Sequence, residues 1–182
     1  MKPKILDIGC GKRKTTHPDV KVTGLDKYNL PGIDIVCDIE KTPLPLENES
    51  FDIIIANHIL EHIDNFFPLM EELHRILKPN GIIKIRVPCW QSHDAFSSPD
   101  HKRFFGLRSF NFFLSDCSEN YYTKARFEII KKEACFINYR SRWKFLNHII
   151  NPIINSWQGF FQKFAILPAE EIYFELRKEM IE

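Results

Sequence analysis

Short apolar runs alternate with polar turns along the first third of the chain. The runs are residues 5–8, 22–25, 33–37 and 51–56, and each ends near Gly, Asp or Asn. Short apolar runs bounded by such turn residues are typical of buried strands. Strands that are apolar on both faces are typical of parallel sheets, so the pattern predicts a parallel sheet.

A helical period follows the fourth run. Between residues 65 and 78 the apolar positions fall on one helical face, and Pro68 stands in the first turn, where proline is tolerated. This face consists of Phe66, Phe67, Met70, Leu73, Ile76 and Leu77. A further apolar run, residues 82–87, follows at once. Strand, helix and adjacent strand form a right-handed crossover unit, which predicts the α/β class.

The first two connections between strands are short. Ten residues separate Gly11 from Val22, and seven separate Leu25 from Ile33. A crossover usually needs about a dozen residues or more, so we expect no full helix in either connection. One face of the sheet near these strands should then be thinly covered, which favours a partner chain or a folded-over C-terminal segment.

The last third of the chain contains two alternating segments and an amphipathic one. Residues 127–130 and 172–177 alternate as strands do, which predicts a terminal antiparallel pair. Between them lies a helical pattern with a nearly uncharged polar face. Its apolar residues are Ile149, Ile150, Ile153, Ile154, Trp157, Phe160, Phe161 and Phe164, and its polar residues are Asn147, Asn151, Asn155, Gln158 and Gln162. A short helix is also predicted near residues 107–114, after a long polar and aromatic loop.

Length and charge narrow the class of protein. The 182 residues suffice for one domain with a sizeable core, and we expect the single domain 1–182. Lys and Arg total 25 against 24 Asp and Glu, so no overall charge attracts nucleic acid or an acidic membrane. A local basic run leaves RNA or a phosphorylated ligand as an alternative partner, although such a run is more often a solvated strand face. That run is Lys124, Arg126, Lys131, Lys132, Arg140, Arg142 and Lys144.

The five cysteines indicate a reducing environment. Their number is odd, and none are spaced as CxxC: Cys10, Cys37, Cys89, Cys117 and Cys135. This argues against a disulfide framework and against a zinc site. The first residues also lack the pattern of a secretory signal, so we expect a cytoplasmic protein.

Polar residues gather where the predicted strands end. Gly9 and Gly11 allow a tight turn after the first strand, at the edge where ligands of open α/β sheets bind. Asp26 ends the second strand, and an acid there accepts both hydrogen bonds of a ribose diol. Asp38 ends the third strand, within reach of an adenine amino group, and Asn57 ends the fourth.

Several stretches in this order resemble the class I S-adenosylmethionine-dependent methyltransferases. They are "ILDIGCGKRK", "GLDKY", "CDIEKTPLPLENESFDIIIANHILEHI" and "ELHRILKPNGIIKIRVP". The LEH sequence after the fourth strand is similar to that of the small-molecule branch. The resemblance spans residues 4–88, about half of the chain. It implies a Rossmann-like, seven-stranded sheet, mostly parallel with an antiparallel C-terminal strand, with 1–88 as the cofactor-binding half and 89–182 as the substrate half.

The resemblance also implies where S-adenosylmethionine binds. Gly9, Cys10 and Gly11 pass under the methionine part, and Asp7 holds the turn and approaches the amino group through water. Asp26 binds the ribose, Asp38 and the Ile39 backbone flank the adenine, and Asn57 meets the methionine part. A dinucleotide needs a helix N-terminus for its pyrophosphate, so the expected lack of that helix disfavours a dehydrogenase. Lys12, Arg13 and Lys14 are either a solvated basic turn or a contact for the methionine carboxylate.

Methyl transfer needs alignment of the reactants and, for a hydroxyl acceptor, a base. The catalytic candidates are His58 after the fourth strand and His93, Asp100 and His101 in the loop after the fifth. For His58 and His62, packing under the cofactor is the alternative, and Glu61 is expected to position backbone. The spacing of the histidines matches no compact ligand motif, so no metal is expected.

The acceptor is expected to be a small molecule or glycan, methylated at oxygen. "NHIL" lacks the proline-aromatic motif of DNA amino-methyltransferases, which disfavours nucleic acid. The amphipathic helix is expected to bury its apolar face against the thinly covered sheet or in a homodimer; contact with a membrane surface or a lipid-linked acceptor is the alternative. The alternative function is a non-catalytic, cofactor-binding partner subunit.

Overall fold

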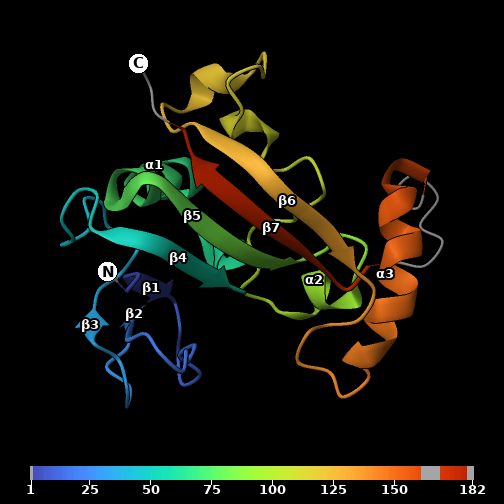
Figure 1. Ribbon diagram of the computed structural model, residues 1–182, viewed down its shortest axis with the longest axis horizontal. Helices are drawn as coiled ribbons and strands as arrows, with labels where there is room; N and C mark the ends of the chain where they lie inside the picture. Colours follow the sequence, from blue (N-terminus) through green and yellow to red (C-terminus); the bar gives the residue numbers. More distant parts are fainter. Residues whose placement is uncertain (1, 161–168, 180–182) are drawn as a thin grey trace.

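The computed structural model describes residues 2–160 and 169–179, and their strands form one seven-stranded sheet of order β3-β2-β1-β4-β5-β7-β6 (Figure 1). The strands are β1 (Ile5–Ile8), β2 (Val22–Asp26), β3 (Ile35–Val36), β4 (Phe51–Asn57), β5 (Leu77–Pro88), β6 (Phe127–Cys135) and β7 (Glu171–Lys178). Strands β1 to β5 pair in parallel, whereas β7 runs antiparallel to both of its neighbours. The predicted α/β fold, Rossmann-like and mostly parallel with an antiparallel C-terminal strand, is confirmed.

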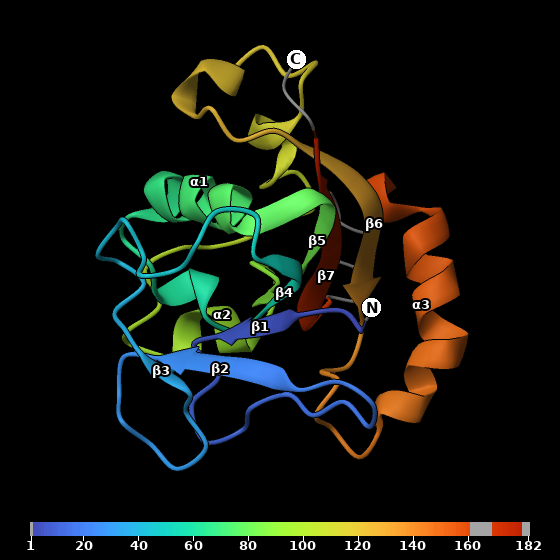
Figure 2. The ribbon, with the colours of Figure 1, turned by 60° about the vertical axis from the view of Figure 1, so that its left-hand side comes forward.

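The crossover helix packs its apolar side on the sheet. Helix α1 (Phe66–Ile76) buries Leu69, Met70 and Leu73 completely and leads directly into β5 (Figure 2). Beyond β5, a group of buried phenylalanines joins α1 to the C-terminal strands: Phe66, Phe105, Phe110, Phe113, Phe127 and Phe174. This core fixes the loop after β5 against the sheet.

The remaining helices are short. They are α2 (His93–Ser97), α3 (Asn147–Ser156) and the 3-10 turns η1 (Leu60–His62), η2 (Asn111–Phe113), η3 (Asn120–Tyr122) and η4 (Lys144–Leu146). The helix predicted at 107–114 is thus only the single turn η2. The connections at residues 9–21 and 27–34 contain no helix, as predicted from their length.

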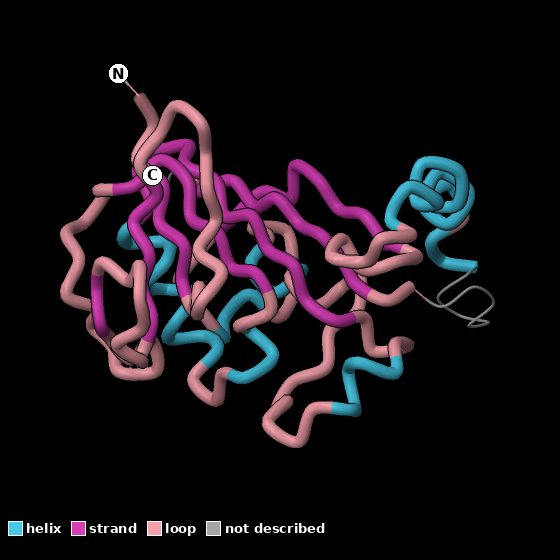
Figure 3. Tube along the Cα trace, turned by 90° about the horizontal axis from the view of Figure 1, so that it is seen from below, coloured by secondary structure: helices cyan, strands magenta, loops and turns pink. Residues whose placement is uncertain are grey.

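Helix α3 packs beside the C-terminal end of the edge strand β6, at the opposite end of the strand order from β3 (Figure 2). Figure 3 shows this helix end-on, beside the ends of the strands. Its polar residues face that edge: Asn155 accepts a hydrogen bond from the Ala134 amide (2.8 Å) and donates one to the Ala134 carbonyl (2.9 Å). Asn151 accepts from the Phe136 amide at 3.0 Å. Asn147 bonds both the amide and the carbonyl of Ile137.

The expected burial of the whole apolar face of this helix against the sheet is therefore wrong for the described part, and the homodimer alternative stays a prediction. Ile150 and Ile154 pack against the core, but Ile149, Ile153 and Trp157 are 66%, 52% and 65% exposed. The physical reason is the edge strand, whose unpaired amides and carbonyls need polar partners that only the asparagine face supplies. Phe161, Gln162 and Phe164 lie outside the described residues.

None of the helices in residues 2–160 and 169–179 has the length and apolar character that crossing a membrane requires.

Candidate functional site

The carboxyl ends of the parallel strands surround a cavity of about 360 Å³, called here the cofactor cavity. Five residues predicted to bind the cofactor line it: Gly9, Gly11, Asp26, Asp38 and Ile39. The structure does not place Asp7, Cys10 or Asn57 on its wall. Additional lining comes from residues that sequence reasoning missed, which are Lys27, Tyr28, Leu30, Glu40, Ile59 and Ile63. The one feature of the sequence that could have identified these residues is their position next to the predicted acids and the LEH turn.

Gly9 and Gly11 both have a left-handed backbone, and they differ in the space that surrounds them. Gly9 has φ +59°, and a Cβ there would lie 2.4 Å from Cγ1 of Ile59, which also lines the cavity. Gly11 has φ +52°, and a Cβ there would meet no atom within 4 Å. The left-handed backbone favours glycine at both positions, and the open space at Gly11 belongs to the cavity.

Asp26 connects the end of β2 to this turn. Its carboxylate accepts hydrogen bonds from the Gly11 amide (2.8 Å) and the Tyr28 amide (3.0 Å), and the residue is 8% exposed. An ionised carboxylate has about four acceptor sites, so two of them stay available to a ligand in the cavity.

Asp7 and Cys10 support the turn from behind. Asp7 is 2% exposed and accepts a hydrogen bond from the Thr15 amide at 2.6 Å. Burial raises the pKa of Asp7, although the bonds from Thr15 oppose this rise. Burial also raises the pKa of the Cys10 thiol to about 11, with a smaller contribution from the charges of Asp7 and Asp26. Cys10 is therefore a neutral thiol that packs in the turn.

The basic turn lies outside the cofactor cavity. The Lys14 ammonium forms an ion pair with Asp34 at 2.8 Å, and Asp34 also accepts a hydrogen bond from the Gly24 amide. These contacts lower the pKa of the Asp34 carboxyl. Lys12 and Arg13 are exposed. The arrangement favours a structural role for this turn over contact with a ligand carboxylate.

A second cavity of about 510 Å³ lies next to the first and shares His58 and His62 with it. We call it the acceptor cavity. Its wall is built from the turn after β4, η1, the end of β5, α2 and the loop that follows α2, together with the loop after β6 and the residue before β7. The lining residues are His58, Glu61, His62, Pro88, Asp94, Ser97, Ser98, Pro99, His101, Asn138, Arg140 and Glu170. Two molecules bound in these cavities would be neighbours.

His58 lies between two buried carboxylates. Its Nδ1 is 3.4 Å from Oε1 of Glu61, and its Nε2 is 3.2 Å from Oε2 of Glu171. Burial alone would lower the pKa of His58, but hydrogen bonds to Glu171 and Glu61 outweigh it and raise the pKa to about 9. A histidine protonated at neutral pH cannot accept a proton, so the geometry suits His58 to positioning rather than to general-base catalysis.

The other catalytic candidates, His101, Asp100 and His93, lie in three different places relative to the two cavities. His101 lines the acceptor cavity, and its Nδ1 is 3.0 Å from the carbonyl oxygen of Ala95. Asp100 lines the cofactor cavity, with Oδ2 3.0 Å from Nδ1 of His62. His93 is exposed, bonds Ser97 on its own helix and is not on the wall of either cavity. The fold therefore brings His58, Asp100 and His101 together and leaves His93 outside.

Residues 6–85 match the family model described as "Methyltransferase domain". Over 102 residues the chain is 33% identical to phthiotriol/phenolphthiotriol dimycocerosates methyltransferase 1 of Mycobacterium ulcerans. This match covers 44% of the chain and 35% of that protein. Over 103 residues it is 31% identical to the mitochondrial ubiquinone biosynthesis O-methyltransferase of Rattus norvegicus, covering 45% and 30%. The chain thus matches about a third of the length of these curated relatives.

Solved structures share the fold over nearly the whole chain. A SAM-dependent methyltransferase from Archaeoglobus fulgidus superposes with a TM-score of 0.60 at 19% identity, covering 97% of this chain and 86% of that one. An S-adenosylmethionine-dependent methyltransferase from Mesorhizobium loti gives 0.56 at 15% identity, covering 97% and 91%. Residues 6–85 are thus similar to a methyltransferase domain, the chain shares the fold of S-adenosylmethionine-dependent methyltransferases, and together these similarities imply S-adenosylmethionine as the cofactor.

Proposed function

We propose that the chain transfers the methyl group of S-adenosylmethionine to an oxygen atom of a small-molecule or glycan-type acceptor. The observation that carries this proposal is the pair of adjoining cavities at the carboxyl ends of the strands, which meet at His58 and His62. The sulfonium cofactor supplies an already activated methyl group. The chain itself then has to align two molecules and exclude water, and neighbouring cavities suit that task.

The residues of the cofactor cavity fit this ligand. Asp26 offers carboxylate acceptors to a ribose diol, and Asp38 and Ile39 flank the position proposed for the adenine. The glycine turn leaves room at Gly11 for the methionine part. For Asp7 we propose an indirect role, because its carboxylate holds the turn through Thr15. No direct cofactor contact is assigned to Cys10 or Asn57.

His101 is the proposed proton acceptor if the acceptor group is a hydroxyl. A carbonyl oxygen only accepts hydrogen bonds, so Nδ1 of His101 donates to Ala95 and Nε2 keeps a lone pair. The protonated His58 and the exposed His93 lack this combination. Asp100 orients His62 rather than His101.

The names of the relatives support a small-molecule acceptor. They include a phthiotriol dimycocerosates methyltransferase, a ubiquinone biosynthesis O-methyltransferase and a sterol 4-C-methyltransferase. Transfer to oxygen, membership of the LEH branch through Leu60, Glu61 and His62, and a cytoplasmic location are parts of our proposal. Five free thiols fit a reducing compartment.

Calorimetry and a transfer assay test the proposal. We expect the purified chain to bind S-adenosylmethionine and S-adenosylhomocysteine with a stoichiometry of about one, and to transfer a labelled methyl group to hydroxylated acceptors. His101→Ala should abolish transfer to a hydroxyl while cofactor binding persists, and His93→Ala should preserve both. Lack of cofactor binding would refute the proposal. Binding without transfer to any acceptor would favour the alternative of a non-catalytic partner subunit.

We further propose that the outer face of α3 contacts an anionic lipid surface. Ile149, Ile153 and Trp157 point away from the sheet, and they continue a set of exposed aromatic residues that includes Trp143 and Phe145. Residues 134–169 contain no Asp or Glu, whereas Arg140, Arg142 and Lys144 lie just before the helix. Exposed Trp and Phe beside Lys and Arg are typical of helices that lie in a membrane interface.

Sedimentation with vesicles tests this contact. We expect binding to phosphatidylcholine vesicles that contain 30% phosphatidylserine and weaker binding to pure phosphatidylcholine. Burial of a large side chain stabilises by about 1.5–3 kcal/mol, so Ile153→Glu or Trp157→Glu should weaken binding by about tenfold or more. Tyr121→Glu, which changes an exposed aromatic residue outside α3, serves as the control. Concentration-dependent dimers that Trp157→Glu disrupts, without vesicle binding, would assign this face to a second copy instead.

A further inference from the structure

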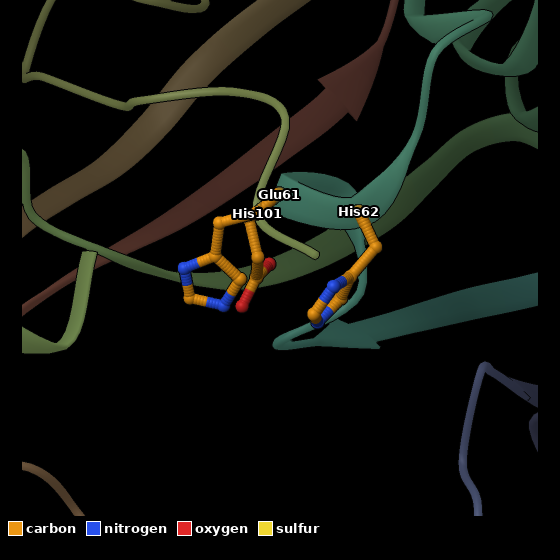
Figure 4. Close-up of side chains that lie close together, drawn as sticks. All are labelled: Glu61, His62 and His101. Carbon is orange, nitrogen blue, oxygen red and sulfur yellow. The ribbon is translucent and has the colours of Figure 1, made fainter. Parts of the chain in front are cut away.

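The fold brings His101 next to Glu61 and His62, which are consecutive residues and precede it by 40 and 39 positions. One donor atom each from Glu61, His62 and His101 lies within 4.8 Å of the others (Figure 4). In this view the Glu61 carboxylate stands between the two imidazole rings. The loop that carries His101 is fixed to η1, because the amides of Lys102 and Arg103 donate to the Glu61 carbonyl at 2.8 and 3.1 Å. We call these three side chains the Glu61 triad.

The Glu61 carboxylate has an unused oxygen. The residue is 1% exposed, and its Oε1 faces Nδ1 of His58 at 3.4 Å. Among the residues that the structure describes, its Oε2 is the one buried side-chain oxygen or nitrogen without a hydrogen-bond partner. Since a buried, unpaired carboxylate oxygen is strongly unfavourable, this atom indicates a missing ligand.

Both imidazoles are oriented by their Nδ1 atoms. Nδ1 of His101 donates to the Ala95 carbonyl at 3.0 Å, and Nδ1 of His62 faces the Asp100 carboxylate at 3.0 Å. In each ring Nε2 is then the atom that can bind a cation. An imidazole held at one nitrogen by a carbonyl or carboxylate is the usual arrangement around metal-bound histidines.

We propose that the Glu61 triad binds a divalent transition-metal ion. One carboxylate and two imidazoles form the donor set of catalytic zinc sites and of open iron and manganese sites, in which further positions stay available to a substrate. Two ligand atoms at about 2.1 Å from one ion lie at most about 4.2 Å apart. Donor atoms that are 4.8 Å apart therefore have to approach one another by at least about 0.6 Å to close around it.

The proposed site replaces the expectation of no metal. That expectation relied on ligand spacing in the sequence, and His101 follows His62 by 39 residues. Only the contact between the loop and η1 places the two histidines next to each other, with ring centroids 4.8 Å apart.

The ion deepens the proposed transfer to oxygen and, in that respect, rests on it. All three ligands line the acceptor cavity. A metal-bound hydroxyl loses its proton more easily than a free one. Because Nε2 of His101 binds the ion, this proton passes to solvent in the acceptor cavity, and the acceptors of this site would be molecules whose hydroxyl can bind the ion. If no ion binds, His101 remains the proposed free base.

Cobalt titration of the metal-free, full-length chain tests the inference. We expect Co²⁺ to bind with a stoichiometry of about one, with visible absorption bands and without the near-ultraviolet absorption of a cobalt–thiolate bond. His101→Ala and Glu61→Gln should each weaken binding by about tenfold or more. His93→Ala, in the same loop, should bind as the unchanged chain does. Circular dichroism and S-adenosylmethionine binding of each variant verify that it is folded.

Two results would overturn the inference. One is a lack of stoichiometric Co²⁺ binding, or binding that His101→Ala and Glu61→Gln leave unchanged. The other is thiolate absorption, which would place the ion on cysteines. Because cofactor binding is measured on the same samples, the failure of the metal site is distinguishable from the failure of the methyltransferase proposal.

Discussion

Replacing Asp26 by alanine is expected to weaken the binding of S-adenosylmethionine by about a hundredfold or more. The substitution removes two proposed hydrogen bonds from the ribose to the carboxylate. A hydrogen bond to a charged group contributes about 1.5–3 kcal/mol, and every 1.4 kcal/mol changes the affinity tenfold. It also releases the Gly11 amide from its 2.8 Å bond, which loosens the turn below the methionine part. Calorimetric titration of both proteins measures the difference.

Two further variants make this result specific. Asp26→Asn keeps the shape and half of the acceptor capacity, so its affinity should fall between those of the other two proteins. Asp19→Ala removes an exposed acid from the connection between β1 and β2 and should bind normally. Equal affinity for Asp26→Ala and Asp19→Ala would show that the cofactor lies elsewhere.

Glu171→Ala is expected to destabilise the fold by about 3–5 kcal/mol. Glu171 is completely buried, and its carboxylate accepts from the Tyr139 amide (2.9 Å) and from Arg86 (3.2 Å) while it faces His58. Removal of one partner of a buried ion pair leaves the other charges uncompensated, which is strongly destabilising. Here two cations, Arg86 and His58, would lose that partner. Urea unfolding followed by circular dichroism gives the free energy.

The neighbouring residue provides the matched control. Glu170 is exposed and accepts one hydrogen bond from the Asn138 amide, so Glu170→Ala should change the unfolding free energy by about 1 kcal/mol or less. A loss for Glu171→Ala no greater than that for Glu170→Ala would contradict the proposed importance of the buried charge group.

The sequence predicts the sheet and its ligand-binding edge because both depend on local patterns. Each apolar run in the first third became a strand, and the helical period after the fourth run became α1 with small shifts at its ends. Gly9, Gly11 and Asp26 stand at strand ends, where topology alone brings them together.

The parts that sequence reasoning missed depend on contacts between distant residues. Glu171 and Arg86 are 85 residues apart. They lie in β7 and β5, strands in which polar and apolar residues alternate, and in such strands a charged residue usually indicates the solvated face. Glu171 is buried and Arg86 is partly buried because the turn after β4 places His58 next to Glu171 and the loop after β6 places Tyr139 over both residues. His62 and His101 meet for a similar reason, through a loop whose path no local period specifies.

The orientation of α3 illustrates a different limit. A helical period shows that two faces exist, but which face meets the protein depends on the surface it packs against. Strand β6 and the residues just after it present amides and carbonyls there, and the asparagines together with Gln158 bond to them.

That asparagine row also bears on how the protein avoids aggregation. An uncovered edge strand is a template onto which a strand from another molecule can add, and such additions propagate into fibrils. Because side-chain amides already occupy the backbone groups of Ala134, Phe136 and Ile137, this part of the sheet cannot be extended by another chain. The molecule can therefore expose apolar side chains on the outer surface of α3 while the adjacent sheet edge stays closed to polymerisation.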